Sequence, residues 1–138
     1  MHEVSTVRLY ALRAMYLLML VGLAVDIWPR VLFPPENLEH MRGVVWSLLA
    51  AVSLLAALGL RYPLKMLPLL FFELVWKTIW VLAIGLPLWL GDRFDPATRD
   101  TWNSCLMGLV LFPLVIPWRY VFEAYVKARG DRWRRAAP

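Results

Sequence analysis

Apolar residues fall into four long runs, and the stretches between them are short, charged or rich in proline. The runs cover residues 9–28, 43–60, 66–90 and 102–122. Each run is near the roughly 20 residues that an α-helix needs to cross about 30 Å of hydrocarbon. The pattern predicts an all-α fold, a four-transmembrane-helix antiparallel bundle in a single integral membrane domain over residues 1–138.

The composition fits the same environment. Hydrophobic residues make up 61% of the chain, against roughly 45–50% in soluble domains. The four runs use most of the 138 residues, which leaves no room for a separate catalytic domain. Any chemistry must therefore lie between helices.

The connections predict which helices are neighbours. The turn at 61–65 is short, so the second and third spans should pack against each other as an antiparallel pair. Small residues at four-residue spacing, Gly43, Ser47 and Ala51, favour close packing of the second span. The loop at 29–42 contains three prolines and should begin as extended chain.

Proline and aspartate positions predict the limits of the fourth span. Asp95 followed by Pro96 has the pattern of a helix N-cap with proline at the first helical position. Pro113 and Pro117 lie within the run and can kink the helix, because proline removes a backbone donor.

Basic residues are divided unequally between the two ends of the bundle. One end, with both termini and the 61–65 turn, has ten Lys or Arg, and the other has four. The positive-inside rule therefore predicts a multi-pass membrane protein with both termini in the cytoplasm, N-in and C-in, and with the two longer loops outside. The ten are Arg8, Arg13, Arg61, Lys65, Arg119, Lys127, Arg129, Arg132, Arg134 and Arg135, and the four are Arg30, Arg42, Arg93 and Arg99.

The basic tail, residues 126–138, is expected to lie in the cytoplasm beside anionic lipid. A nucleic-acid partner is not expected, because the tail is short and tethered to the bilayer. No cofactor or metal is expected either. Cys105 is the single cysteine, no Cys/His pattern indicates metal ligation, and His2 and His40 lie in flanking or loop segments.

The most informative polar feature is a couple of opposite charges, Glu73 and Lys77, inside the third span. Glu73 lies roughly 12 Å along the helix from Lys65 at a rise of 1.5 Å per residue. Four-residue spacing places the two charges on one face, in the favourable order for a helix pair. Charges inside a membrane are costly and are typically paired and functional, so this couple is the default candidate site.

Neighbouring residues extend this candidate into a ligand-binding or structural polar cluster. Trp76 and Trp80 flank the pair, and a packed indole beside an ammonium group adds a cation–π interaction. Asp26, near the outer end of the first span, lies within reach of the long lysine side chain, and Thr78 closes the cluster. Asn103 and Ser104, at the outer end of the fourth span, are further candidates.

The pair has two interpretations. In the first, Glu73 and Lys77 neutralise each other and fix the rotation of the helix, so that removal of one partner leaves a buried charge. In the second, burial prepares Glu73 for proton handling or for holding a polar ligand. The residues alone favour the first interpretation only slightly.

Two segments, YPLKMLPLLFFELVWK at 62–77 and FPLVIPWRYV at 112–121, resemble a group of small uncharacterised bacterial four-helix membrane proteins. That resemblance implies no activity. The chain also resembles the EXPERA four-helix membrane family, whose members include sterol isomerases and hold ligands in an intramembrane pocket with acidic residues. Asp26 and Glu73 resemble those acids, although that family carries its acidic helix as the second span and Lys77 would occupy the place of a ligand's cation.

The sequence thus favours a small polytopic inner-membrane protein of non-enzymatic type. It would bind a partner (accessory) subunit, a second copy of itself or a hydrophobic small molecule through its helix bundle. Two alternatives stay open: an EXPERA-like ligand-binding protein or isomerase that uses Asp26 and Glu73, and a minimal proton or ion conductor. An enclosed pocket that reaches Glu73 and holds a lipid-like molecule would favour the EXPERA-like alternative, a continuous wet path would favour the conductor, and a dry core would favour the non-enzymatic protein.

Overall fold

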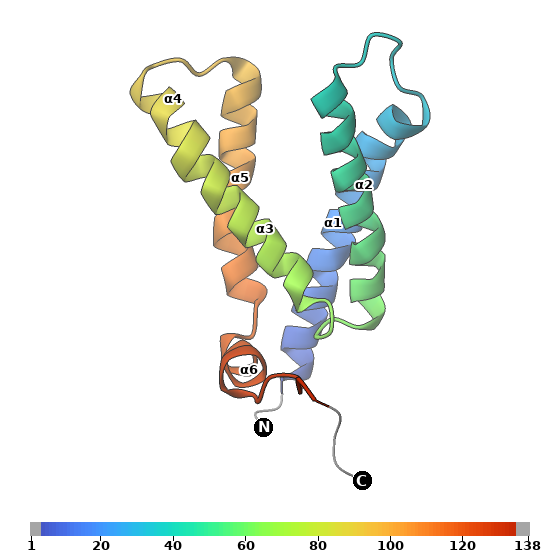
Figure 1. The fold of residues 1–138 in the computed structure, drawn as a ribbon, viewed down its shortest axis with the longest axis vertical. Helices are drawn as coiled ribbons and strands as arrows, with labels where there is room; N and C mark the ends of the chain where they lie inside the picture. The colour runs from blue at the N-terminus through green and yellow to red at the C-terminus, as the bar shows by residue number, and fades with distance from the viewer. Residues whose placement is uncertain (1–3, 135–138) are drawn as a thin grey trace.

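The computed structural model describes residues 4–134, and every regular element in that range is helical. The first two helices pack side by side and are here called the N-terminal hairpin; they are α1 (Thr6–Leu32) and α2 (His40–Arg61). A long helical segment follows, here called the rod, which consists of α3 (Leu67–Trp80), the π-helix η1 (Val81–Gly85) and α4 (Leu86–Leu90). The rod packs against α5 (Pro96–Val115), and the two form the C-terminal hairpin (Figure 1).

By length and composition, this is a polytopic membrane protein. Three helices are long and apolar enough to cross a membrane, and their bounds agree with the first three predicted spans to within a few residues: Thr6–Leu32, His40–Arg61 and Leu67–Leu90. The bounds differ most at Pro29, which lies inside α1 instead of opening an extended loop. Proline so near the helix end removes only one late hydrogen bond, and the Pro29 carbonyl still accepts from Phe33 N at 3.1 Å.

The fourth predicted span, over 102–122, is not one continuous helix but is broken near the prolines that the sequence marked as possible kinks. α5 ends at Val115, and the chain then turns by 78° into a second helix made of α6 (Trp118–Val121) and the π-helix η2 (Phe122–Lys127). Counted as one broken span, this pair gives a fourth crossing. Pro117 lacks the N–H that would bond to the Pro113 carbonyl, and the Trp118 indole donates to that carbonyl at 2.8 Å instead.

The start of α5 agrees with the sequence. Asp95 is the N-cap residue, its carboxylate accepts from Thr98 N at 2.7 Å, and Pro96 occupies the first helical position. The basic tail predicted from 126 begins within η2 and continues to 134 without regular structure. Arg135 and the rest of the tail lie outside the described residues, as does His2.

The N-terminal hairpin is held by small residues of α2 that face α1. A Cβ atom on Gly59 would lie 2.5 Å from the Tyr16 ring, so only glycine allows this approach. Ser53 is fully buried and accepts a hydrogen bond from Trp28 Nε1 at 2.8 Å. The predicted packing of α2 on α3 is therefore wrong: those two helices share few contacts, and Ser47 and Ala51 are exposed.

The two hairpins meet at the end that carries both termini and splay apart at the other (Figure 1). Side chains of α1 tie this closed end together by donating to carbonyl oxygens at the ends of other elements. Arg13 Nε donates to Leu60 O and the Tyr16 hydroxyl to Pro63 O, each at 2.9 Å. The fully buried core lies at the same end and includes Leu12, Tyr16, Leu67, Leu70 and Ile116.

Candidate site: a central cleft with a buried ion pair

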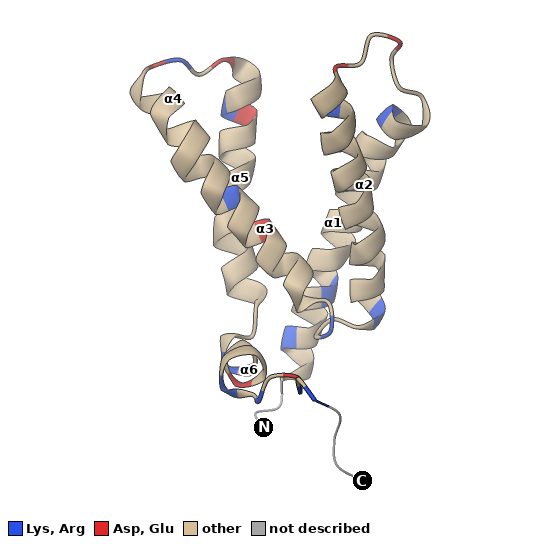
Figure 2. Ribbon diagram, viewed as in Figure 1, with Lys and Arg blue, Asp and Glu red and all other residues tan. Residues whose placement is uncertain are grey.

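A space of about 570 Å³ lies between the two hairpins and is here called the central cleft. One wall belongs mainly to α1 and includes Met15, Met19 and Gly22. The opposite wall is formed by α3 and α5. The cleft is largely apolar, with Glu73 and Lys77 among its lining residues. Figure 2 shows these two charges on α3, at mid-height of an otherwise uncharged stretch of helix.

Glu73 and Lys77 form the ion pair that their spacing predicts. Lys77 Nζ donates to Glu73 Oε2, and the indole Nε1 of Trp76 donates to the same oxygen at 3.2 Å. The two charged side chains are only 6% and 12% exposed. One carboxylate oxygen therefore holds both donors, and the pair is shielded from its surroundings.

The lysine is seated against α5. A Cβ atom on Gly108 would lie 2.6 Å from Lys77 Cε, so the missing side chain leaves room for the lysine stem. Its ammonium group lies 4.3 Å from the centre of the Trp76 ring and 5.4 Å from that of Phe112. These ring faces add cation–π attraction to the ion pair. Sequence reasoning missed Gly108 and Phe112 because they lie on another helix at no fixed spacing from Lys77.

The second oxygen of Glu73 accepts no hydrogen bond from the described residues. Hydrogen bonds from Lys77 and Trp76 both end on Oε2, and none among the described residues ends on Oε1. Within residues 4–134, no fully buried side-chain oxygen lacks a partner. Oε1 is therefore not fully buried, and Glu73 is one of the residues that line the central cleft.

Asp26 lines the same cleft but is engaged elsewhere. It pairs with Arg30 at 3.1 Å, and its side chain is 60% exposed. The contact between Asp26 and Lys77 that the sequence suggested is not formed. The four-residue spacing from Asp26 to Arg30 is the same signal that identified Glu73 and Lys77, and it could have revealed this partner.

The remaining sequence candidates divide between the cleft and other places. Ser104 lines the cleft, whereas Thr78 is exposed and donates to Leu74 O at 2.7 Å. Trp80 belongs to an aromatic cluster around Trp102, at 6.5 Å between ring centres, that joins the rod to α5 near the splayed end. Its role is in packing the C-terminal hairpin. The described residues contain no group of three or more His, Cys, Asp or Glu placed to hold a metal ion.

Comparisons of this chain with protein-family models, with curated proteins and with solved structures found no match. The central cleft and its buried pair are therefore interpreted from their own chemistry.

Proposed function

We propose that this chain is a non-enzymatic membrane protein that binds a neutral hydrophobic small molecule in the central cleft. The molecule carries a hydrogen-bond donor, such as a hydroxyl or amide group, that bonds to Glu73 Oε1. The observation that carries the proposal is a carboxylate with one satisfied and one open oxygen on the wall of an apolar cleft. Apolar walls with a few polar groups that fix orientation are typical of small-molecule sites.

The size of the cleft favours a small molecule over a partner helix. A transmembrane helix about 10 Å wide and 30 Å long occupies roughly 2,400 Å³. The cleft offers about 570 Å³, which is within the range of about 300–1,000 Å³ found for ligand pockets. A partner helix would have to force the hairpins apart, whereas a lipid-sized molecule fits without that cost.

The charge of the pair favours a neutral ligand. Lys77 already neutralises Glu73, so a cationic ligand at Oε1 would meet the like charge of the ammonium group. In an EXPERA-like mechanism Glu73 would be one of the two acids, but it is already held by Lys77 and Trp76. Asp26, the second acid of an EXPERA-like mechanism, is paired with Arg30.

The orientation in this proposal is N-in and C-in in a bacterial inner membrane. Nine Lys or Arg of the described chain lie at the closed end, against four at the splayed end, which is the bias of the positive-inside rule. The central cleft then opens toward the outer half of the bilayer. A reporter that works only in the cytoplasm should be active when it is fused to the C-terminus. Activity of a C-terminal reporter that works only outside the membrane would contradict this orientation.

The binding proposal is tested by replacing both charges with apolar side chains of similar size. The double variant Glu73→Leu/Lys77→Met should fold, because removing both partners leaves no stranded charge. It should lose the ligand's hydrogen bond to a charged acceptor, which weakens binding by about tenfold or more. The readout is mass spectrometry of small molecules that co-purify with the protein in mild detergent. Equal amounts on the wild-type protein and the folded double variant would contradict the proposal.

A further inference from the structure

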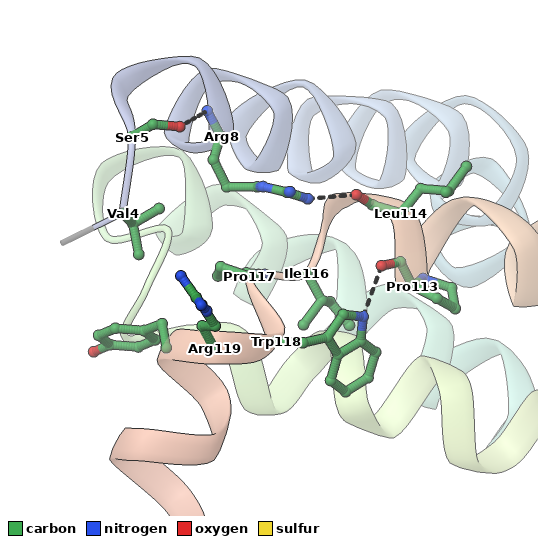
Figure 3. A pocket seen from close by; sticks show the side chains of 10 residues that line it. Val4, Ser5, Arg8, Pro113, Leu114, Ile116, Pro117, Trp118 and Arg119 are labelled. Carbon is green, nitrogen blue, oxygen red and sulfur yellow. Dashed lines mark hydrogen bonds between the residues drawn. The ribbon is translucent and has the colours of Figure 1, made fainter. Parts of the chain in front are cut away.

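A second cavity, of about 450 Å³, lies at the closed end where α5 breaks. The first turn of α1 lines one side, and the broken segment between α5 and α6 lines the other (Figure 3). Arg8 and Arg119 are among its lining residues, which include no carboxylate. We propose that this cavity, here called the basic pocket, binds the phosphate group of an anionic lipid between Arg8 and Arg119.

The break in the fourth span builds the basic pocket. The turn of 78° after Val115 carries the start of α6 beneath the first turn of α1. Figure 3 shows the Arg119 side chain rising from the start of α6 toward Val4. A straight helix would have carried Arg119 away from α1, so the pocket exists because the helix is bent.

The guanidinium group of Arg8 is held by one hydrogen bond and keeps other N–H donors for a ligand. Its Nη1 donates to Leu114 O, a carbonyl left free by the break, and Ser5 Oγ accepts from Arg8 N at 3.2 Å. A guanidinium group has five N–H donors, so one bond to Leu114 leaves the others available. Planar arginine forks match the geometry of phosphate oxygens.

Arg119 supplies the second charge. The ion pairs Asp26–Arg30 and Glu73–Lys77 do not involve it, and its side chain is exposed. Two cations around one cavity without a lining carboxylate repel each other, and an anion between them removes that repulsion.

The surroundings favour a lipid as the source of the phosphate. Trp118 lines the pocket and is half exposed, and its indole N–H donates to Pro113 O. Its ring can therefore contact lipid headgroups, and tryptophan is enriched at the membrane–water interface. Trp118 also starts the helix that turns away from α5. The phosphate of a lipid headgroup would lie beside both arginines, and the acyl chains of that lipid would run along α5.

The test is native mass spectrometry of the full chain in detergent with added phosphatidylglycerol or phosphatidylcholine. Wild-type protein should bind phosphatidylglycerol preferentially. The variant Arg119→Gln should weaken that binding about fivefold, and Arg119→Lys should weaken it less, because the charge remains while the fork is lost. Arg119 is exposed, so both variants should fold.

The matched control is Arg132→Gln, which makes the same change in net charge in the exposed tail, outside the basic pocket. Its phosphatidylglycerol binding should equal that of the wild type. Equal losses in Arg119→Gln and Arg132→Gln, or no loss in either, would overturn the proposal in favour of diffuse attraction. In a parallel arm without lipid, binding of inorganic phosphate with the same dependence on Arg119 would identify free phosphate as the source.

Discussion

Glu73 and Lys77 show how a buried pair can be stable and still offer a binding group. Both donors, from Lys77 and Trp76, use Oε2, which leaves Oε1 without a hydrogen bond from the described residues, and Glu73 lines the central cleft. The structural and the functional interpretation of the pair are therefore compatible. The lysine neutralises the carboxylate, and in the proposed function the carboxylate's other oxygen accepts from the ligand.

The single variant Lys77→Met separates these two roles. It leaves the Glu73 carboxylate buried without its counter-charge, so the free energy of unfolding should fall by about 3–5 kcal/mol. Glu73→Leu/Lys77→Met should recover most of that loss. Unfolding of the purified variants in detergent measures both. A single variant as stable as the double variant would mean that Glu73 is not held by Lys77.

At the scale of elements, the cap of α5 depends on an ionised carboxylate. Hydrogen bonds from Thr98, the side chain first and then the backbone N–H, lower the pKa of Asp95 below its usual 3.8. A lowered pKa means that the cap stabilises α5 above the unfolded-state pKa and is lost as the pH falls through the folded-state pKa. The first turn of α5 should therefore fray in acid below about pH 4.

Amide hydrogen exchange at Thr98 and Arg99 measures this fraying. The matched variant is Asp95→Asn, which keeps a capping oxygen but cannot titrate. Its exchange should show no acid-dependent opening at this helix start. If exchange at these residues depends on acid equally in both proteins, titration of Asp95 is not the cause of the fraying.

We expect Pro117 to cause the bend after α5. Pro117→Ala supplies the N–H that the Pro113 carbonyl lacks, so α5 and α6 should straighten from 78° toward a continuous helix. Spin labels at Asn103 and Lys127 should then move apart by about 7 Å at 1.5 Å per residue. Electron–electron resonance measures the distance.

Pro113→Ala is the control for the bend. Pro113 lies within α5, and the helix continues past it to Val115. The label distance in this variant should equal that in the parent. An unchanged distance in Pro117→Ala as well would assign the bend to the contacts of Arg8 and Trp118 instead of to the proline.

For the whole molecule, the sequence indicated the helical spans but not how they are arranged. The apolar runs located the first three spans because burial in lipid requires about 20 apolar residues whatever the packing. The partner of α2 was missed because a short turn indicates which helices are joined, whereas packing depends on shape, here of Gly59 against Tyr16. Pro117 was recognised as a possible kink, but the direction of the bend depends on contacts with α1.

The candidate site was predictable to the same extent. Glu73, Lys77 and Trp76 were found because they lie within one turn of one helix, where spacing fixes contact. The central cleft itself could not be found, since it arises from the splay of two hairpins that meet at one end, where Arg8 of α1 donates to Leu114 O of α5. Such long-range carbonyl contacts leave no periodic signal in the sequence.

The most direct test of the central claim is to fill the cleft without touching its polar pair. Gly22 lines the cleft, and a Cβ atom there would meet nothing within 4 Å, so Gly22→Leu adds bulk without a clash at the backbone. Ala14→Leu, on an exposed position of the same helix, is the control. Mass spectrometry should find a neutral hydrophobic molecule on the wild-type and Ala14→Leu proteins and not on Gly22→Leu. Equal amounts on all three would contradict the account.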